Sequence, residues 1–234
     1  MSNDSYINWK SWNSDLFGSS SRLEDAYYHN IIKLLGITKT SKILEVGFGN
    51  GSFLGFLNRK QINSEGVESN KILVDAALSG NFCAYNSIFE IDKSKEYNFI
   101  FLFDVIEHIP ANQIEDFLSS LCNHLEEFGK IFMRFPNGSS PLGLANQHGD
   151  ITHCNIITIS KLNYWCFNAN LKVESYRGDF LPFIFRHNLF KMPSRLLKLT
   201  LYKIIERIIR FISNQSKGVL SSNLQAVIVK NHES

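Results

Sequence analysis

The chain alternates between short apolar runs and longer segments in which apolar residues recur at helical spacing. The clearest run, residues 97–104 (YNFIFLFD), is almost continuously apolar, as expected for a central parallel strand covered on both faces. Shorter runs predict six further strands, at 42–47, 62–68, 81–86, 130–135, 171–176 and 224–229. Helical spacing predicts helices over 21–35, 51–59, 70–79, 111–125 and 161–168. This alternation predicts an α/β fold, with a Rossmann-like, doubly wound, mostly parallel seven-stranded sheet and helices on both faces.

Residues that start and stop helices support these boundaries. Ser20 or Ser21 can cap the first predicted helix and Gly36 can end it. Pro110 opens the segment 111–125, and Gly129 separates it from the strand 130–135. Ser160 is expected to cap the helix 161–168.

The whole chain, residues 1–234, is expected to form a single domain. Residues 1–20 are polar with Trp9, Trp12 and Phe17 among them, and predict an N-terminal arm that packs by its aromatic rings. Residues 136–158 form a polar loop punctuated by Gly and Pro; a loop of this length in a compact domain is typical of a functional segment. Residues 179–215 are expected to form a helical insert before the last strand.

Two interpretations of this insert remain open. It contains a phenylalanine cluster (Phe180, Phe183, Phe185 and Phe190), an apolar helical stripe and an excess of basic residues from Arg186 to Arg210. The simpler interpretation is a helix that covers the core and exposes a solvated basic face. The alternative is a lid over the acceptor, facing an anionic or membrane-associated substrate, with peripheral membrane contact through 186–212.

Composition narrows the classes of function. The net charge is only +2 over 234 residues, so no nucleic-acid partner is expected. No signal peptide and no apolar stretch long enough for a spanning helix is evident, which predicts a cytoplasmic protein that at most contacts the inner membrane face. Cys83, Cys122, Cys154 and Cys166 lack paired metal-ligand spacing and are expected to be reduced, buried thiols.

The stretch ILEVGFGNGSFL, residues 43–54, predicts a strand, a tight glycine turn and a helix. Glycines suit a turn with positive φ and a ligand that approaches bare backbone. The spacing is G-x-G-x-G and differs from the G-x-G-x-x-G of dinucleotide-binding proteins, which makes an NAD-dependent enzyme the least favoured alternative. Glu45, Glu68 and Asp104 end three predicted parallel strands, at the edge where such sheets bind ligands.

Together these features resemble the class I S-adenosylmethionine-dependent methyltransferases. ILEVGFGNGSFL is similar to the glycine-rich first motif of that family, GVES to its second-strand acid, and FLFDVIEHIP to its fourth-strand motif. The E-H pair is common in its small-molecule and sugar methyltransferases. The resemblance covers residues 20–178 and implies that the last two strands form an antiparallel edge.

The resemblance implies S-adenosyl-L-methionine as cofactor and assigns roles to single residues. Glu45 would orient the first loop and meet the methionine amino group, while Glu68 would bind the ribose hydroxyls. Asn86 stands where the family often has an acid facing adenine, and its amide oxygen can accept the same hydrogen bond. The implied cofactor-binding residues are Glu45, Gly47, Phe48, Gly49, Gly51, Glu68, Ser69, Asn86, Ser87, Asp104 and Val105.

Methyl transfer to a hydroxyl needs in-line positioning and a proton acceptor, and the pKa of histidine suits that role. His108 follows the fourth parallel strand, near the expected methyl end of the cofactor. His148, Asp150 and His153 lie in the loop 136–158, which can cross the acceptor site. We expect the catalytic group to come from this set, with His108 and His153 ahead of the others.

No metal is expected. His148, His153 and Cys154 lack a standard zinc spacing and a fourth ligand. The alternative hypothesis of a metal site is a divalent ion held by Asp104, Asp150 and substrate oxygens.

The loop also resembles loops of bacterial methyltransferases that modify surface-polysaccharide sugars. This implies O-methylation of a sugar or sugar-phosphate, on an acceptor that is phosphate-bearing or lipid-linked, with Arg134, Arg177 and Arg186 as phosphate ligands. Two alternatives stay open. One is a methyltransferase acting on a quinone, a lipid or another small molecule; the other is a cofactor-binding, non-catalytic subunit of a glycan-assembly complex.

Overall fold

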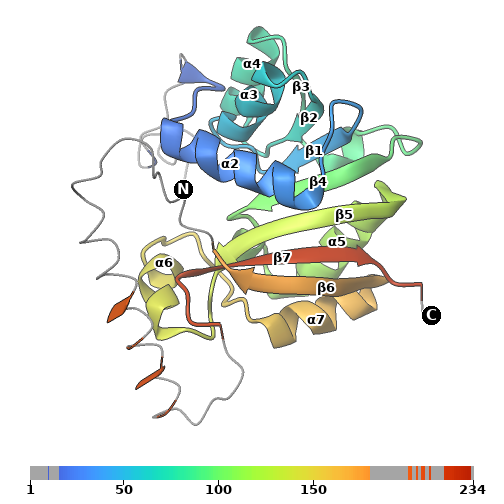
Figure 1. Ribbon diagram of the computed structural model, residues 1–234. Coiled ribbons are helices and arrows are strands. Elements are labelled where there is room, and N and C mark those ends of the chain that lie inside the picture. Colours follow the sequence, from blue (N-terminus) through green and yellow to red (C-terminus); the bar gives the residue numbers. More distant parts are fainter. Residues whose placement is uncertain are drawn as a thin grey trace.

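The computed structural model describes residues 10, 16–179, 200, 201, 204, 207, 208, 211 and 219–232. Its centre is a seven-stranded sheet in the order β3-β2-β1-β4-β5-β7-β6 (Figure 1). β7 is antiparallel to both β5 and β6, and the other neighbouring strands are parallel, which confirms the predicted mostly parallel sheet. The strands are β1 (Lys42–Val46), β2 (Asn63–Val67), β3 (Cys83–Tyr85), β4 (Tyr97–Phe103), β5 (Leu125–Pro136), β6 (Leu171–Gly178) and β7 (Asn223–Lys230).

Helices cover both faces of this sheet (Figure 1). Successive residues of a strand point to opposite faces, so each strand contributes to both layers. On β4, Ile100 and Leu102 pack in the same core cluster as residues of α5 and α7. Phe101 packs in a second cluster with residues of α2 and α3, in which many of the phenylalanines gather. The helices are α2 (Arg22–Leu35), α3 (Ser52–Arg59), α4 (Lys71–Ser79), α5 (Ile114–Asn123), α6 (Leu144–His148) and α7 (Ile159–Asn168).

The start and stop residues act as predicted at the first helix. Ser21 and Glu24 form a capping box, in which each side chain accepts a hydrogen bond from the backbone N–H of the other. Gly36 ends the helix with φ +70° and donates its N–H to the carbonyls of the last turn. These contacts fix the two ends of α2, and its buried residues Tyr27, Tyr28, Ile31 and Ile32 pack in the second cluster.

Three predictions about local structure were wrong. β5 begins at Leu125 and runs through Gly129, because the strand continues past a register shift between Tyr97 and Phe99. α7 begins two residues earlier than expected, because Thr158, not Ser160, accepts the hydrogen bond from the backbone N–H of Lys161. Of the four thiols, only that of Cys166 is buried, and none forms a disulfide.

The two variable segments of the chain are described only in part. Trp9, Trp12 and Phe180, together with most of the predicted insert 179–215, lie outside the described residues. The described insert residues Leu201, Ile204, Ile208 and Phe211 are helical and exposed. Within the described part of the chain, no helix combines the length and apolar character needed to cross a bilayer.

Candidate active site

The carboxyl ends of β1, β2 and β4 lie side by side, because Val46 is paired with Val67 on one side and Leu102 on the other. Turns from these strands surround a cavity of about 970 Å³. Ten of the eleven predicted cofactor-binding residues line it: Glu45, Gly47, Phe48, Gly49, Glu68, Ser69, Asn86, Ser87, Asp104 and Val105. The edge of the sheet thus gathers residues from four separate stretches of sequence.

Gly51, the eleventh predicted residue, does not line the cavity, although its neighbours Asn50 and Ser52 do. It caps the N-terminus of α3 with φ +71°, and a Cβ placed there would meet the ring of Phe17 at 2.2 Å. Gly47 also has a positive φ of +73°, and its missing side chain leaves room for Val105. These two glycines allow the turns after β1 and β4, and the aromatic ring before α2, to approach one another closely.

Glu45 is buried at the end of β1, with 3% of its surface exposed. Burial raises the pKa of its carboxyl well above the usual value; a hydrogen bond from the Leu54 backbone lowers it, and the charge of Glu68 raises it further. Its Oε2 has no hydrogen-bond partner among the described residues. A buried acceptor without a partner, at a cavity wall, suits a ligand amino group.

Glu68 is held by backbone groups on both sides. Its Oε2 accepts a hydrogen bond from the N–H of Gly49 at 3.0 Å, and its Oε1 accepts from the N–H of Asn70 at 3.0 Å. Ser69 adds a hydroxyl donor at 3.2 Å. The carboxylate therefore ties the glycine turn to the end of β2 and keeps a fixed orientation toward the cavity.

Asn86 and Ser87 follow β3. The Asn86 amide nitrogen donates to the carbonyl of Glu68 over 3.5 Å, an orientation in which its amide oxygen is the group able to accept. The Ser87 hydroxyl accepts from the N–H of Phe89 and caps a short 3₁₀ turn. This part of the wall is thus polar near the strand end and apolar beyond it, where Ile88 and Phe89 also line the cavity.

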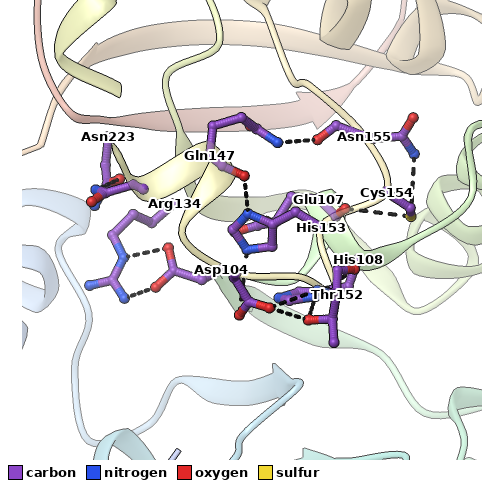
Figure 2. A network of polar contacts seen from close by, with 12 residues as sticks. Asp104, Glu107, His108, Arg134, Gln147, Thr152, His153, Cys154, Asn155 and Asn223 are labelled. Atoms are coloured by element: carbon purple, nitrogen blue, oxygen red, sulfur yellow. Dashed lines mark hydrogen bonds and ion pairs between the residues drawn. The ribbon is translucent and has the colours of Figure 1, made fainter. Parts of the chain in front are cut away.

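Asp104 has an unusual backbone conformation for a non-glycine residue, with φ +56°. Both of its carboxylate oxygens bind Arg134, Oδ1 with Nε at 3.1 Å and Oδ2 with Nη2 (Figure 2). The guanidinium also lies over the rings of Tyr27 and Phe103, at 5.4 and 5.3 Å from their centres. Arg134, expected to bind phosphate, is therefore already paired with a carboxylate.

His108 is the member of the predicted catalytic set that lines the cavity. It ends the 3₁₀ turn η3 (Ile106–His108), and its Nδ1 lies 3.3 Å from the carbonyl oxygen and 3.0 Å from the hydroxyl of Thr152. Burial lowers the pKa of His108, and the charge of His153 lowers it further. The imidazole therefore stays neutral near pH 7, in the form that can accept a proton.

His153 and Asp150 lie directly behind this wall. The rings of His108 and His153 meet edge to face, with centres 4.7 Å apart. Asp150 accepts hydrogen bonds from the side chains of Lys10, at 2.7 Å, and Thr152. Burial would raise the pKa of Asp150, but these hydrogen bonds outweigh it and bring the pKa to about 2.

Loop 136–158 reaches the end of β4 through backbone hydrogen bonds. The N–H groups of Cys154 and Asn155 donate to the carbonyl of Glu107 at 3.0 and 3.1 Å, and the buried Gln147 donates to the carbonyl of Asn155. This pairing brings Asp150, Thr152 and His153 against the turn that carries His108. His148 lies apart from the cluster, exposed at the end of α6.

Glu107, which is absent from the predicted set, is the most deeply buried ionisable group of the cluster. It is 0% exposed, and neither of its carboxylate oxygens has a hydrogen-bond partner among the described residues. Burial, and then the charge of Asp104, raises its pKa to about 8. Its position directly before His108 in the E-H pair was the available signal. Lys10, which also lines the cavity, gave no sequence signal.

Comparisons with known proteins agree with this geometry. The family model described as a methyltransferase domain matches residues 20–176. Among solved structures, a SAM-dependent methyltransferase from Archaeoglobus fulgidus is 17% identical, with a TM-score of 0.62 over 87% of this chain and 92% of that one. A TehB-like SAM-dependent methyltransferase from Corynebacterium glutamicum is 15% identical, with a TM-score of 0.59 over 98% of both chains.

The plantazolicin methyltransferase BpumL, solved with a substrate analogue and SAH, is 18% identical, with a TM-score of 0.55 over 90% of this chain and 83% of its own. None of the curated proteins matches the sequence significantly. These structural likenesses show the fold, and the family match extends over more than half of the chain. The chain belongs to the family of methyltransferase domains.

Proposed function

We propose that the protein is an S-adenosylmethionine-dependent O-methyltransferase, with residues 1–234 acting as one methyltransferase domain. Its acceptor is a hydroxyl of a sugar or sugar-phosphate of a surface glycan. The observation that carries the proposal is a single cavity with two chemically different walls. One wall holds the strand-end acids Glu45 and Glu68 beside the glycine turn, and the other holds the neutral imidazole of His108.

The first wall fits the methyl donor. The unpartnered Oε2 of Glu45 can accept from an amino group, and the fixed carboxylate of Glu68 can accept from vicinal hydroxyls. Asn86 adds an amide oxygen further along the wall, where the apolar Ile88 can lie against a flat ring. When bound, the donor supplies an electrophilic methyl group on a sulfonium.

The second wall fits a hydroxyl acceptor. Transfer of a methyl group needs an in-line approach, which is a matter of positioning. A hydroxyl must also lose its proton, and among the described residues His108 is the histidine that lines the cavity, with the ring of His153 against it. His108 therefore acts on the acceptor, and His153 and Asp150 hold it from behind.

Polar side chains also favour a sugar at the outer part of the cavity. Gln113, Asp116 and Ser120 on and before α5 line it together with Thr152, and all four can bond hydroxyl groups. Arg134 is paired with Asp104, and Arg177 donates a hydrogen bond to Gln225. Because both arginines already have side-chain partners, we do not propose them as phosphate ligands.

A lipid-linked acceptor is supported by the insert. Leu201, Ile204, Ile208 and Phe211 are 48%, 47%, 52% and 88% exposed, at spacings of three and four residues that put them on one helical stripe. A core-covering helix would bury these side chains. An exposed apolar stripe in a basic segment suits peripheral contact with an anionic membrane face, where a lipid-linked glycan precursor would be found.

The test is a transfer assay with isotopically labelled methyl donor against nucleotide sugars, lipid-linked sugars, quinones and fatty acids, read by mass spectrometry. We expect label on a sugar oxygen. His108→Ala should lower kcat by about 100-fold or more and leave the Kd of the donor within about twofold. Label on a quinone or lipid would replace the acceptor assignment, and donor binding without transfer to any class would support a non-catalytic subunit.

A further inference from the structure

We propose that Glu107, His108 and His153 form a binding site for one divalent first-row transition-metal ion beside the cavity. One potential ligand atom from each side chain lies within 4.8 Å of the other two. Glu107 and His108 come from the turn after β4, and His153 comes from the loop after β5, so the two segments close on one point (Figure 2). This differs from the sequence interpretation, which expected no metal.

The state of Glu107 is the independent observation that points to an ion. The side chain is fully buried, and both carboxylate oxygens lack hydrogen-bond partners among the described residues. A buried carboxyl group without a hydrogen-bond partner is unfavourable in either protonation state, so native structures usually provide such groups with a partner. Among the described residues the nearest cationic candidate is His153, whose Nε2 lies 3.9 Å from Oε1, beyond hydrogen-bond distance.

The two imidazoles are held in the tautomer that binds metals. Nδ1 of His153 lies 3.0 Å from the carbonyl oxygen of Gln147, and Nδ1 of His108 lies 3.3 Å from that of Thr152. A carbonyl oxygen can only accept, so each ring carries its proton on Nδ1 and keeps the lone pair of Nε2 for another partner. Metal-binding histidines are oriented by this kind of hydrogen bond.

The distances around Nε2 of His153 are a few tenths of an ångström longer than those between ligands on one ion. This nitrogen lies 3.9 Å from Glu107 Oε1 and 3.8 Å from Asp150 Oδ2. Two ligands at bond lengths of about 2.0–2.2 Å on one tetrahedral ion stand roughly 3.4 Å apart. Small side-chain rotations therefore bring the donors to coordination distance. Asp150, already bonded to Lys10 and Thr152, adds negative charge beside the ion without being required as a ligand.

The donor set indicates the kind of ion. Two imidazole nitrogens and one carboxylate oxygen favour Zn²⁺, Mn²⁺, Fe²⁺ or Co²⁺ over Mg²⁺ and Ca²⁺, which prefer oxygen ligands. Three protein ligands leave a position open, as in catalytic sites. Cys154 is outside the donor set, because its thiol donates to the carbonyl of Glu107.

The inference deepens the proposed function and rests on it only for its catalytic consequence. Because His108 both lines the cavity and supplies a ligand atom, the ion adjoins the acceptor site. A divalent ion lowers the pKa of an oxygen that it contacts. Glu107, His108 and His153 would hold such an ion, which would favour ionisation of an acceptor hydroxyl that it contacts, and His108 would then serve as a ligand instead of as the proton acceptor.

The test is direct metal binding, without methyl donor or acceptor. Chelator-treated protein comprising residues 1–234 is titrated with Zn²⁺ by calorimetry and with Co²⁺ by visible absorption. We expect one ion per chain, and at least a tenfold weaker affinity in Glu107→Gln, which preserves side-chain shape, and in His153→Ala. His148→Ala, in the same loop but exposed, is the matched control and should bind like the parent protein.

Three outcomes separate this inference from the proposed function. Absence of stoichiometric binding, or binding that neither Glu107→Gln nor His153→Ala weakens, overturns the metal site. Methyl transfer by chelator-treated protein with unchanged kcat overturns its catalytic consequence and leaves the proposed function standing. One-to-one binding with no transfer to any acceptor class would support the metal site and contradict the proposed function.

Discussion

Glu45 and Glu107 are both buried carboxyls near the ends of neighbouring parallel strands, yet they lie in differently built regions. Around Glu45 the cavity wall is mainly backbone: glycine turns, the N–H groups that hold Glu68, and the start of α3. Around Glu107 it is mainly side chains, drawn from residues as far apart as Lys10 and Asp150. We call these regions the donor wall and the acceptor wall.

This difference suggests that the donor wall suits a ligand common to many proteins of this fold, whereas the acceptor wall suits a ligand particular to this protein. Backbone groups at strand ends recur whenever the same sheet is built, so the donor wall can bind one common ligand without specialised residues. An acceptor wall made from long-range side-chain contacts changes with each substitution in the loop 136–158. We therefore expect acceptor specificity to depend on the turn 104–108, the loop 136–158 and the insert 179–215, because binding specificity commonly lies in segments outside a rigid scaffold.

The largest effect on the donor wall is expected from Glu68→Ala. The change removes the carboxylate that we expect to bind the ribose hydroxyls, and it also releases the N–H groups of Gly49 and Asn70. Hydrogen bonds to charged groups contribute about 1.5–3 kcal/mol each, so calorimetry should show at least a roughly 100-fold rise in the Kd of the donor. Asp75→Ala, an exposed change on α4, is the control. A change below about threefold in Glu68→Ala would remove Glu68 from the donor site.

The donor wall was also the more predictable region. Local patterns carry it: the apolar run of β4, the capping box of Ser21 and Glu24, and the alternate glycines all act between residues close in sequence. The acceptor wall depends on contacts such as Lys10 with Asp150, which no local pattern encodes. For this reason the histidines were found as single candidates, while the buried role of Glu107 was missed.

Gly129 shows the same limit on a smaller scale. As an isolated sequence signal it predicts a break before a strand, because glycine is a poor strand residue. In the fold, β5 continues through it, since pairing with β4 resumes at Lys130 after the irregularity. Tertiary pairing therefore decides a boundary that local propensity leaves ambiguous.

A smaller effect is expected from Glu45→Gln, which separates charge from shape at the donor wall. The neutral amide keeps the buried volume but cannot pair as strongly with an amino group, so the Kd of the donor should rise about tenfold. Calorimetry measures this change beside Glu68→Ala. An unchanged Kd would mean that the donor's amino group is bound elsewhere.

Although Glu45→Gln should weaken donor binding, it should make the protein without ligand more stable than the parent at pH values where Glu45 of the unfolded chain is ionised. The pKa of Glu45 is raised in the folded protein, so the unfolded chain loses this proton at lower pH than the folded one. Stability of the parent protein therefore falls as pH rises above the unfolded pKa, about 4.3. Gln cannot ionise, so denaturant unfolding of Glu45→Gln should lack this contribution and show a flatter pH dependence. An identical pH profile would mean that Glu45 ionises alike in both states.

The smallest effect is expected from His148→Ala. This variant tests whether a loop residue must contact His108 to matter for the acceptor wall, or whether any histidine of the loop 136–158 contributes. His148 and His153 are five residues apart in one polar loop, and both belong to the catalytic set predicted from the sequence, in which His153 ranks ahead of His148. The fold separates them, because His153 packs against His108 while His148 ends α6 at the surface. Exposed substitutions away from a site usually change stability by under about 0.5 kcal/mol, so kcat/KM should stay within about twofold of the parent value. Steady-state kinetics beside His153→Ala measures the contrast. A tenfold or larger fall for His148→Ala would move the acceptor site to the outer face of α6, and the cluster around Glu107 would then support the loop rather than the reaction.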